Sequence, residues 1–150
     1  MYGKATQTAI AALSRLAEVY DEGDTRLSAS EIAQTRGLQQ PFVSKVLSTL
    51  SQAGIIEGTR GPGGGFAFAK HPREVKLYDV YILFEQEEGS ETCPIGGGIC
   101  GSGETCPLHA RLARVSKANR EVLQTTFEIF RSAWHKRQEH APWRRIDSSQ

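Results

Sequence analysis

The chain has 150 residues, of which 39% are hydrophobic, and its formal net charge at pH 7 is +1. This length fits one domain, or one domain with a long appended element. The near-zero charge excludes a uniformly basic coat, and no apolar run approaches the roughly 20 residues of a membrane span. The amino terminus also lacks the charged-then-apolar order of a signal peptide, so we expect a cytoplasmic protein with reduced thiols.

Three helices are predicted in the first third of the chain. Residues 4–20 keep their apolar side chains at helical spacing. A capping-box pattern, Ser28-x-x-Glu31, opens a second helix that ends before Gly37. A third helix is expected over residues 40–53, with a proline in its first turn. Two helices joined by a glycine turn are typical of a helix-turn-helix.

Two short strands around a glycine-rich tip follow the third helix. Residues 55–57 and 66–69 flank the tip Gly-Thr-Arg-Gly-Pro-Gly-Gly-Gly, which predicts a β-hairpin, the wing of a winged helix. Arg60 is the only charge on the tip, and an arginine on a slim loop can enter the minor groove of DNA. The tip joins strand to strand and lacks the Gly-Lys-Ser/Thr of a phosphate-binding loop, so no nucleotide site is expected.

Charge is distributed unevenly along the chain. Residues 36–76 contain six Lys or Arg and two acids, whereas residues 85–91 contain four acids and no base. A basic segment beside an acidic strip favours an anionic partner for the basic segment. We therefore predict a mainly α fold with a small β-hairpin, in which residues 1–86 form a winged helix-turn-helix DNA-binding domain. Its last helix is expected over about residues 78–86, with three side chains buried: Val80, Leu83 and Phe84.

A cysteine-rich loop, residues 87–109, holds all three cysteines of the chain. Five glycines lie between Cys93 and Cys106, with Cys100 between them, so the backbone can fold tightly around a small group. The proline after Cys106 predicts a helix start that places this thiol at the positive end of the helix dipole. His109 lies on the same first turn. Three thiolates and an imidazole are soft ligands, which indicates a site for an iron–sulfur cluster or zinc.

Other interpretations of this loop stay open from the residues alone. Three cysteines cannot pair completely, but one disulfide and a spare thiol would also use them. Structural zinc sites usually show Cys-x2-4-Cys pairs, and none occurs here. His109 by itself would be an ordinary surface histidine, and its place beside a clustered cysteine is what makes it a candidate ligand.

One long helix is predicted from Pro107 to about Glu139, because no Gly or Pro interrupts this stretch. Two apolar stripes run along it. The first contains Leu112, Val115, Asn119, Val122, Thr126, Ile129 and Ala133. The second contains Leu123, Phe127, Phe130 and Trp134.

A helix this long cannot bury both stripes in a head of this size, so the first should face a second copy of the chain. We assign residues 110–139 as a dimerisation helix, and Asn119 in its seam could fix the register. The alternative is that both stripes pack on the same chain. Residues 140–150 are expected to form a flexible tail. The predicted dimer contacts are Leu112, Val115, Asn119, Val122 and Ile129.

The order of these parts resembles the iron–sulfur cluster-binding winged-helix regulators, the IscR/NsrR-like family. The resemblance runs from the first helix to about Ile129, and the wing Arg60-Gly-Pro-Gly-Gly-Gly-Phe66 is one of its two most specific pieces. The other is the set Cys93, Cys100, Cys106 and His109. The resemblance implies a homodimer that binds double-stranded DNA at a palindromic operator, is not an enzyme, and holds a cluster with three cysteines.

In that family the fourth ligand is either a histidine three residues after the last cysteine or a side chain from the partner's first helix. His109 fits the first possibility. The position matching the second is near Gln7, which offers neither a carboxylate nor a thiol. The first cysteine gap is one residue longer than the five common in the family, so cluster nuclearity stays open between 2Fe–2S, which we slightly favour, and 4Fe–4S.

DNA contacts are expected from the recognition helix in the major groove and from the wing in the minor groove. Ser44 stands where IscR-like members carry an acidic residue that discriminates between operators, so the family's target sequences are not transferred to this chain. The predicted DNA-binding residues are Gln39, Gln40, Phe42, Ser44, Lys45, Arg60, Gly61, Pro62 and Gly63. An aromatic side chain such as Phe42 could touch a thymine methyl, although an aromatic in this place is often core.

The sequence therefore predicts a dimeric transcription regulator that senses redox, iron or nitric oxide status through an iron–sulfur cluster. A first alternative keeps DNA binding but makes the three thiols a metal-free oxidation sensor. A second alternative, from another class, is a small iron–sulfur electron carrier. A carrier has little use for a winged helix, and the sequence shows no Ser/His/Asp or paired-carboxylate constellation that would favour an enzyme.

Overall fold

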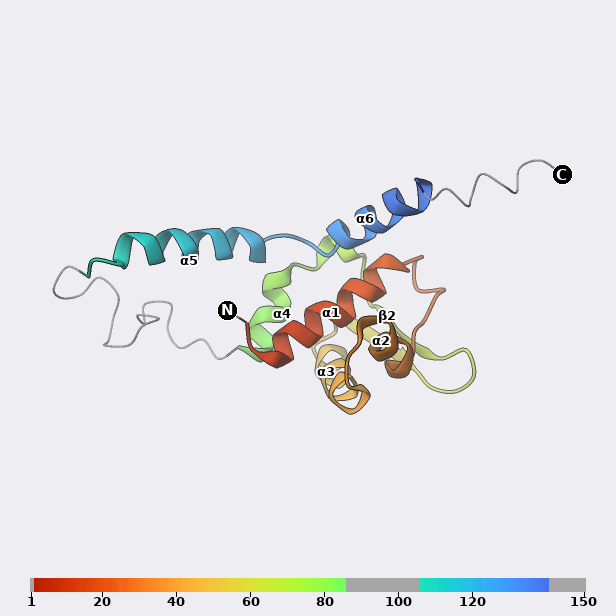
Figure 1. Ribbon diagram of the computed structural model, residues 1–150. Helices are drawn as coiled ribbons and strands as arrows, with labels where there is room; N and C mark the ends of the chain where they lie inside the picture. Colours follow the sequence, from red (N-terminus) through yellow and green to blue (C-terminus); the bar gives the residue numbers. More distant parts are fainter. Residues whose placement is uncertain (1, 86–105, 141–150) are drawn as a thin grey trace.

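The structure of the chain is a computed structural model, which describes residues 2–85 and 106–140 (Figure 1). The helices and strands follow one another as α1 (Lys4–Glu18), α2 (Ala29–Arg36), α3 (Gln40–Gln52), β1 (Ile56–Thr59), β2 (Gly65–Phe68), the 3-10 helix η1 (Pro72–Glu74), α4 (Leu77–Phe84), α5 (His109–Leu123) and α6 (Glu128–Glu139). Helices α1 to α4 and the hairpin gather into one head, α5 extends away from it, and α6 lies along α1 (Figure 1). The predicted mainly α fold with a small hairpin is confirmed.

The helix-turn-helix forms for local reasons that the sequence shows. The Ser28 hydroxyl accepts a hydrogen bond from the backbone N–H of Glu31 at 3.1 Å, and the Glu31 carboxylate accepts one from the backbone N–H of Ser28 at 2.7 Å. This reciprocal pair satisfies two donors that the first turn of α2 would leave without partners. Gly37 ends α2 in the left-handed region, with φ of 63°, which costs a glycine little. The chain then turns directly into α3.

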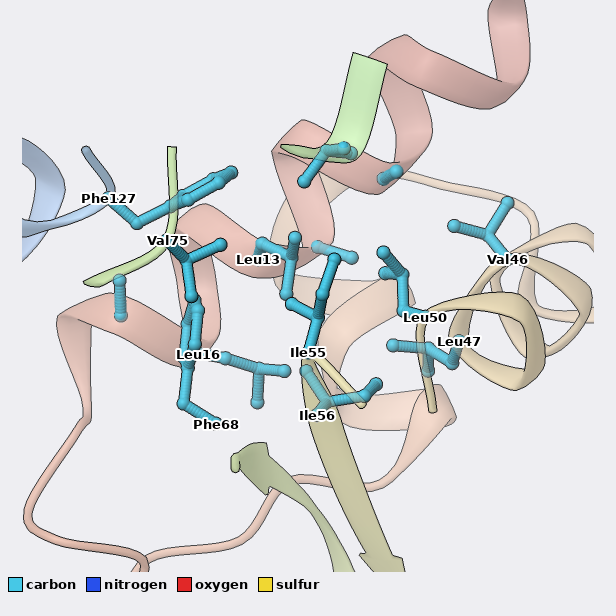
Figure 2. Packing of buried hydrophobic residues seen from close by; sticks show 14 of the residues in the cluster. Leu13, Leu16, Val46, Leu47, Leu50, Ile55, Ile56, Phe68, Val75 and Phe127 are labelled. Carbon is cyan, nitrogen blue, oxygen red and sulfur yellow. The ribbon is translucent and has the colours of Figure 1, made fainter. Parts of the chain in front are cut away.

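The core of the head lies between α1, α3 and the hairpin (Figure 2). Leu13 and Leu16 of α1 are buried in the same cluster as Leu47 and Leu50 of α3, and Leu16 lies near Phe68 and Val75 (Figure 2). The antiparallel strands pair Ile56 with Phe68 at one end of the register and Thr59 with Gly65 at the other. The apolar end of the hairpin is thereby buried in the core, and its glycine-rich end projects from the head.

A buried acidic side chain fastens three helices of the head together. Glu18 of α1 is only 6% exposed, and its carboxylate lies 2.8 Å from the guanidinium of Arg36 at the end of α2. Arg15 lies 3.1 Å from the same carboxylate and Arg137 of α6 lies 3.6 Å from it. A buried carboxylate needs such partners, because leaving it alone in the interior would be strongly destabilising. Glu18 therefore links α1 to the end of α2 and to α6.

The prediction of one unbroken helix from Pro107 to Glu139 is wrong, because residues 124–127 leave the helix between α5 and α6. The backbone N–H of Leu77 donates to the carbonyl of Thr125 at 2.9 Å, and that of Phe127 donates to the carbonyl of Val75 at 3.0 Å. Phe127 is fully buried in the head beside Val75 (Figure 2). Pairing with residues 75–77 and burial of this ring replace the helical hydrogen bonds, so no Gly or Pro is needed to break the helix.

Helix α4 differs from its predicted form at its carboxyl end. It ends at Phe84, with Glu85 as its C-cap, rather than at residue 86. Val80 is fully buried as predicted, whereas Leu83 is 37% exposed and Phe84 is only half-buried. The predicted burial of Leu83 is wrong, because the described part of the chain covers only one side of this helix. Within the same ranges, no helix has the length and apolar character that crossing a membrane requires.

Candidate DNA-binding surface and cluster site

Helix α3 exposes polar side chains to solvent, because its apolar side chains are packed in the core. Its buried side chains are Val43, Val46, Leu47 and Leu50. On the other side, Gln39, Gln40, Ser44 and Lys45 are all exposed. Amide, hydroxyl and ammonium groups on the amino-terminal half of a recognition helix can hydrogen-bond base edges and phosphates. These four predicted residues therefore lie together on one accessible surface.

Phe42 is arranged differently from its four predicted neighbours. Its ring is half-buried and packs against the core, which is the alternative that the sequence left open. The ammonium group of Lys4, at the start of α1, lies 5.2 Å from the centroid of this ring. A cation over an aromatic face is favourable, and it brings a positive charge to the amino-terminal end of α3. Lys4 was not among the predicted residues, since nothing in the local sequence pattern links residue 4 to residue 42.

The wing tip carries Arg60, Gly61, Pro62 and Gly63, all of them exposed. The tip is tight: the backbone N–H of Gly64 donates to the carbonyl of Gly61 at 2.9 Å, and a Cβ at Gly64 would lie 2.3 Å from the carbonyl oxygen of Thr59. Only glycine fits at that position. The guanidinium of Arg60 has no ion pair or hydrogen bond within residues 2–85 and 106–140. It is therefore available to an anionic partner.

A groove separates α3 from the wing and has a volume of about 320 Å³. We call it the α3–wing groove. It is lined by Ser44, Ser48, Ser51 and Gln52 of α3 and by Gly58, Thr59, Arg60 and Phe66 of the hairpin. The serines at four- and three-residue intervals were visible in the sequence as a polar face of the recognition helix. The hairpin wall that completes the groove was not visible, because it depends on how β1 lies against α3.

The described part of the predicted cluster site is the turn that precedes α5. Cys106 is half-buried and is not in a disulfide. The backbone N–H of His109 donates to the carbonyl of Cys106 at 3.1 Å, so the two residues share one turn. Helix α5 begins at His109, two residues later than predicted, and Cys106 therefore precedes the helix instead of capping it. Cys93 and Cys100 lie outside the described residues.

The segments on both sides of the cysteine-rich loop are tied to the start of α1. The carboxylate of Glu85 accepts hydrogen bonds from the backbone N–H of Gly3 at 2.7 Å and from the hydroxyl of Thr6 at 2.5 Å. The Thr6 hydroxyl first, and then the Gly3 N–H, lower the pKa of Glu85. On the other side, the hydroxyl of Tyr2 donates to the side-chain oxygen of Asn119 in α5 at 2.5 Å. The first residues of the chain thus join α4 to α5.

The two predicted stripes of the carboxyl-terminal segment have different surroundings. In the second stripe Leu123 and Phe127 are buried, and the ring of Trp134 lies 5.2 Å from the guanidinium carbon of Arg15 in α1. In the first stripe Val115 is 53% exposed and Val122 is 51% exposed. Ile129 is 55% exposed, and Leu112 is half-buried. The second stripe therefore packs on the chain's own head, while the first is left largely open.

A recognition helix, an arginine-tipped wing and an uncovered apolar stripe beyond the head define a winged-helix DNA-binding regulator. A family model described as Rrf2, iron-dependent transcriptional regulator, matches residues 2–128. The chain belongs to the Rrf2 family of transcription regulators, and within it to the IscR/NsrR-like type. Members of this family bind DNA.

Three known proteins illustrate the similarity. The HTH-type transcriptional repressor NsrR of Streptomyces coelicolor is 33% identical over 100 residues, which cover 63% of this chain and 67% of that protein. CymR, the global cysteine regulator of B. subtilis, has a TM-score of 0.69 at 24% identity, covering 89% of this chain and 97% of its own. IscR of T. potens has a TM-score of 0.66 at 22% identity, covering 89% and 88%. At these identities the two structures show the fold alone. In three other curated relatives, the aligned segment spans 69%, 40% and 62% of the relative's length.

Proposed function

We propose that this Rrf2-family chain is a cytoplasmic, homodimeric regulator that binds a palindromic operator and senses redox, iron or nitric oxide status through an iron–sulfur cluster. One observation carries the proposal: a free Cys106 shares a turn with His109 at the foot of α5, a helix tied to the same head that presents α3 and the wing. A candidate sensor and a candidate DNA-reading surface thereby belong to one connected structure. The names of IscR and NsrR among its relatives agree with a regulatory role.

The residues present fit an iron–sulfur cluster in their chemistry. Cys106 is a free thiol at a half-buried position, and the other two cysteines and His109 complete a set of soft ligands. Cys93, Cys100, Cys106 and His109 would hold the group, with 2Fe–2S slightly favoured over 4Fe–4S. When bound, a cluster would supply a centre that changes its charge or disassembles on reaction with oxidants or nitric oxide, or when iron is scarce.

The chain's own contacts offer a way to relay a change at this site. Glu85, which precedes the cysteine-rich loop, accepts hydrogen bonds from Gly3 and Thr6, while Tyr2 donates one to Asn119 of α5. Lys4, within the same short segment, lies over Phe42 at the start of the recognition helix. A displacement at the loop would therefore act on a segment that also contacts α3. Regulation follows only if the two states bind DNA with different free energies.

Anaerobic purification tests the sensing half of the proposal. We expect iron and acid-labile sulfide in the isolated protein, with visible absorption that disappears on exposure to an oxidant. Operator affinity, measured for the cluster-loaded and the cluster-free protein at matched salt, should differ between the two forms. Protein that contains neither iron nor sulfide under strict anaerobiosis would contradict the cluster assignment.

His109→Ala distinguishes a cluster from a metal-free thiol sensor. If His109 is a ligand, the variant should bind the metal at least about 10- to 100-fold more weakly, which is the usual loss when a group supporting a metal ligand is removed. Its visible spectrum should also differ from that of the wild type. If the protein is a metal-free thiol sensor, the His109→Ala variant should respond to peroxide in the DNA-binding assay as the wild type does. His135→Ala is the matched control, because His135 is an exposed histidine on α6. Equal spectra for both variants and the wild type would remove His109 from the site.

A further inference from the structure

We infer that the α3–wing groove holds one sugar–phosphate strand of the bound DNA, with Ser48, Ser51 and Thr59 as hydrogen-bond donors to its phosphates. None of these three residues is among the predicted DNA contacts. The inference rests on the proposed function, in which α3 enters the major groove and Arg60 enters the adjacent minor groove. A single sugar–phosphate strand separates two adjacent grooves of a duplex, so that strand must pass between α3 and the wing.

The wall of the groove formed by α3 is a continuous row of hydrogen-bonding side chains. Ser44, Ser48 and Ser51 are spaced by four and three residues, which places them on one face of the helix. This face flanks the buried apolar face of α3, and the half-buried Ser51 lies at the border between the two. Gln52 continues the row toward the carboxyl end. Ser44 and Ser48 are exposed and Ser51 is half-buried, so all three can be reached from outside.

The polar groups of the groove are not used within the described chain. The side chains of Ser48, Ser51 and Thr59 make no hydrogen bond to residues 2–85 or 106–140. By contrast, the hydroxyl of Thr49, the residue next to Ser48, donates to the carbonyl of Lys45 at 3.3 Å. Hydroxyl groups are frequent donors to phosphate oxygens at protein–DNA interfaces, where such contacts set the position of the protein on the duplex.

The charge of the groove also suits an anionic strand. Arg60 is the only charged residue of its lining, and no acid lines it. Glu57 of β1 precedes the groove residue Gly58 in the sequence. Its carboxylate lies 2.8 Å from the guanidinium of Arg26, so its negative charge is paired with a positive one. Small-molecule pockets are lined mostly by apolar side chains, whereas here Phe66 is the only large apolar residue of the lining. A groove that offers several hydroxyl groups and one cation fits a DNA backbone better than it fits a small ligand.

The test is DNA binding by the double variant Ser48→Ala/Ser51→Ala, made in the full chain and purified anaerobically. Binding is measured on an operator selected from genomic DNA and on a random duplex, over a series of salt concentrations. Loss of two neutral hydrogen bonds should weaken binding about 5- to 20-fold. Because phosphate contacts carry no sequence information, the loss should be equal on both duplexes, and the slope of log affinity against log salt should not change.

Two other variants calibrate this result. Ser116→Ala removes an exposed hydroxyl from α5, outside the head, and should leave affinity unchanged. Arg60→Ala removes a cation and should reduce the salt slope by about one. Unchanged affinity of the double variant would overturn the inference. A loss confined to the operator would overturn it too, because it would show that the two serines read bases.

Neutral phosphates supply a second, independent measurement. Methylphosphonate groups are placed one at a time along the operator backbone, and the affinities of the wild type and the double variant are compared. A phosphate seated in the groove should weaken the wild type when neutralised but weaken the double variant much less, as in a double-mutant cycle. Equal losses at every position would contradict the inference. If the wild type shows no preference for any operator, the proposal of sequence-specific binding is contradicted. The affinity of the double variant for the random duplex still tests the proposed phosphate contacts in the α3–wing groove.

Discussion

Glu85 closes the amino-terminal end of α1 although it lies 82 positions from Gly3 in the sequence. The α1 helix has no side-chain cap of its own, and the carboxylate of Glu85 takes that role from α4. A negative charge at a helix amino terminus is favourable, and the hydrogen bond from Gly3 satisfies one of the donors left free there. The pKa of Glu85 is accordingly lowered, by the Thr6 hydroxyl first and the Gly3 N–H second.

We predict that Glu85→Gln lowers the free energy of unfolding by about 1 kcal/mol at pH 7. Because the pKa of the folded state is lowered, this stabilisation is complete above the ordinary glutamate pKa and is lost as the pH falls through the lowered value. Urea unfolding of both proteins at pH 7 and at about pH 3.5 should therefore show a difference that shrinks in acid.

Glu121→Gln is the control for that experiment, because Glu121 is an exposed carboxylate on α5 whose side chain has no partner in the described ranges. Its stability should match that of the wild type at both pH values. A stability difference for Glu85→Gln that stays constant from neutral to acid pH would show that the charge of Glu85 does not act on α1.

At the scale of the elements, the break between α5 and α6 divides the carboxyl-terminal segment into two helices with different surroundings. Phe127 is fully buried, with ring centroids 5.9 Å from Phe68 and 5.8 Å from Phe130. Burying a whole aromatic side chain contributes several kcal/mol, which outweighs the few helical hydrogen bonds that the break exchanges for bonds to residues 75–77. Helix α6 thereby belongs to the head, and α5 alone projects from it.

We predict that Phe127→Ala lowers the free energy of unfolding by about 3–5 kcal/mol, the usual cost of emptying a buried aromatic site. Phe127→Leu, which keeps most of the apolar volume, should lose less. The contacts of Phe127 lie within one chain, so the destabilisation measured by thermal melting should not vary with protein concentration. A loss that disappears at high protein concentration would instead place Phe127 in a contact between chains.

At the scale of the whole molecule, the open stripe of α5 is the surface on which the proposed homodimer depends. Val115 and Val122 are both more than half exposed, although a helix usually buries its apolar stripe. We predict that the double variant Val115→Glu/Val122→Glu is monomeric in sedimentation at concentrations where the wild type is dimeric. Two buried charges without partners would cost more than a helix–helix interface supplies.

Lys117→Glu provides a control with the same total change of charge, placed on the opposite face of α5. It should remain dimeric. The monomeric variant should also bind a palindromic operator far more weakly than the control, since one head then contacts one half-site at a time. Wild-type protein that sediments as a monomer over the whole concentration range would contradict the dimer itself.

The sequence by itself determined the parts whose causes are local. The capping box at Ser28, the turn at Gly37 and the glycine-rich wing each depend on residues within a few positions of one another, and the structure confirms all three. The clustering of cysteines is likewise a local fact, readable from spacing alone. Its geometry stays a prediction, since Cys93 and Cys100 lie outside the described residues.

Only the tertiary structure decided the features that join distant parts of the chain. The helix break at residues 124–127, the hydrogen bonds of Glu85, the cation of Lys4 over Phe42 and the α3–wing groove all join parts of the chain that no local window contains. Helical periodicity shows that a face is apolar but not what covers it. That is why the helix break at Phe127 was not predicted and Leu83 was wrongly predicted to be buried. The free energy of burying a side chain depends on neighbours that the fold, and not the local pattern, brings together.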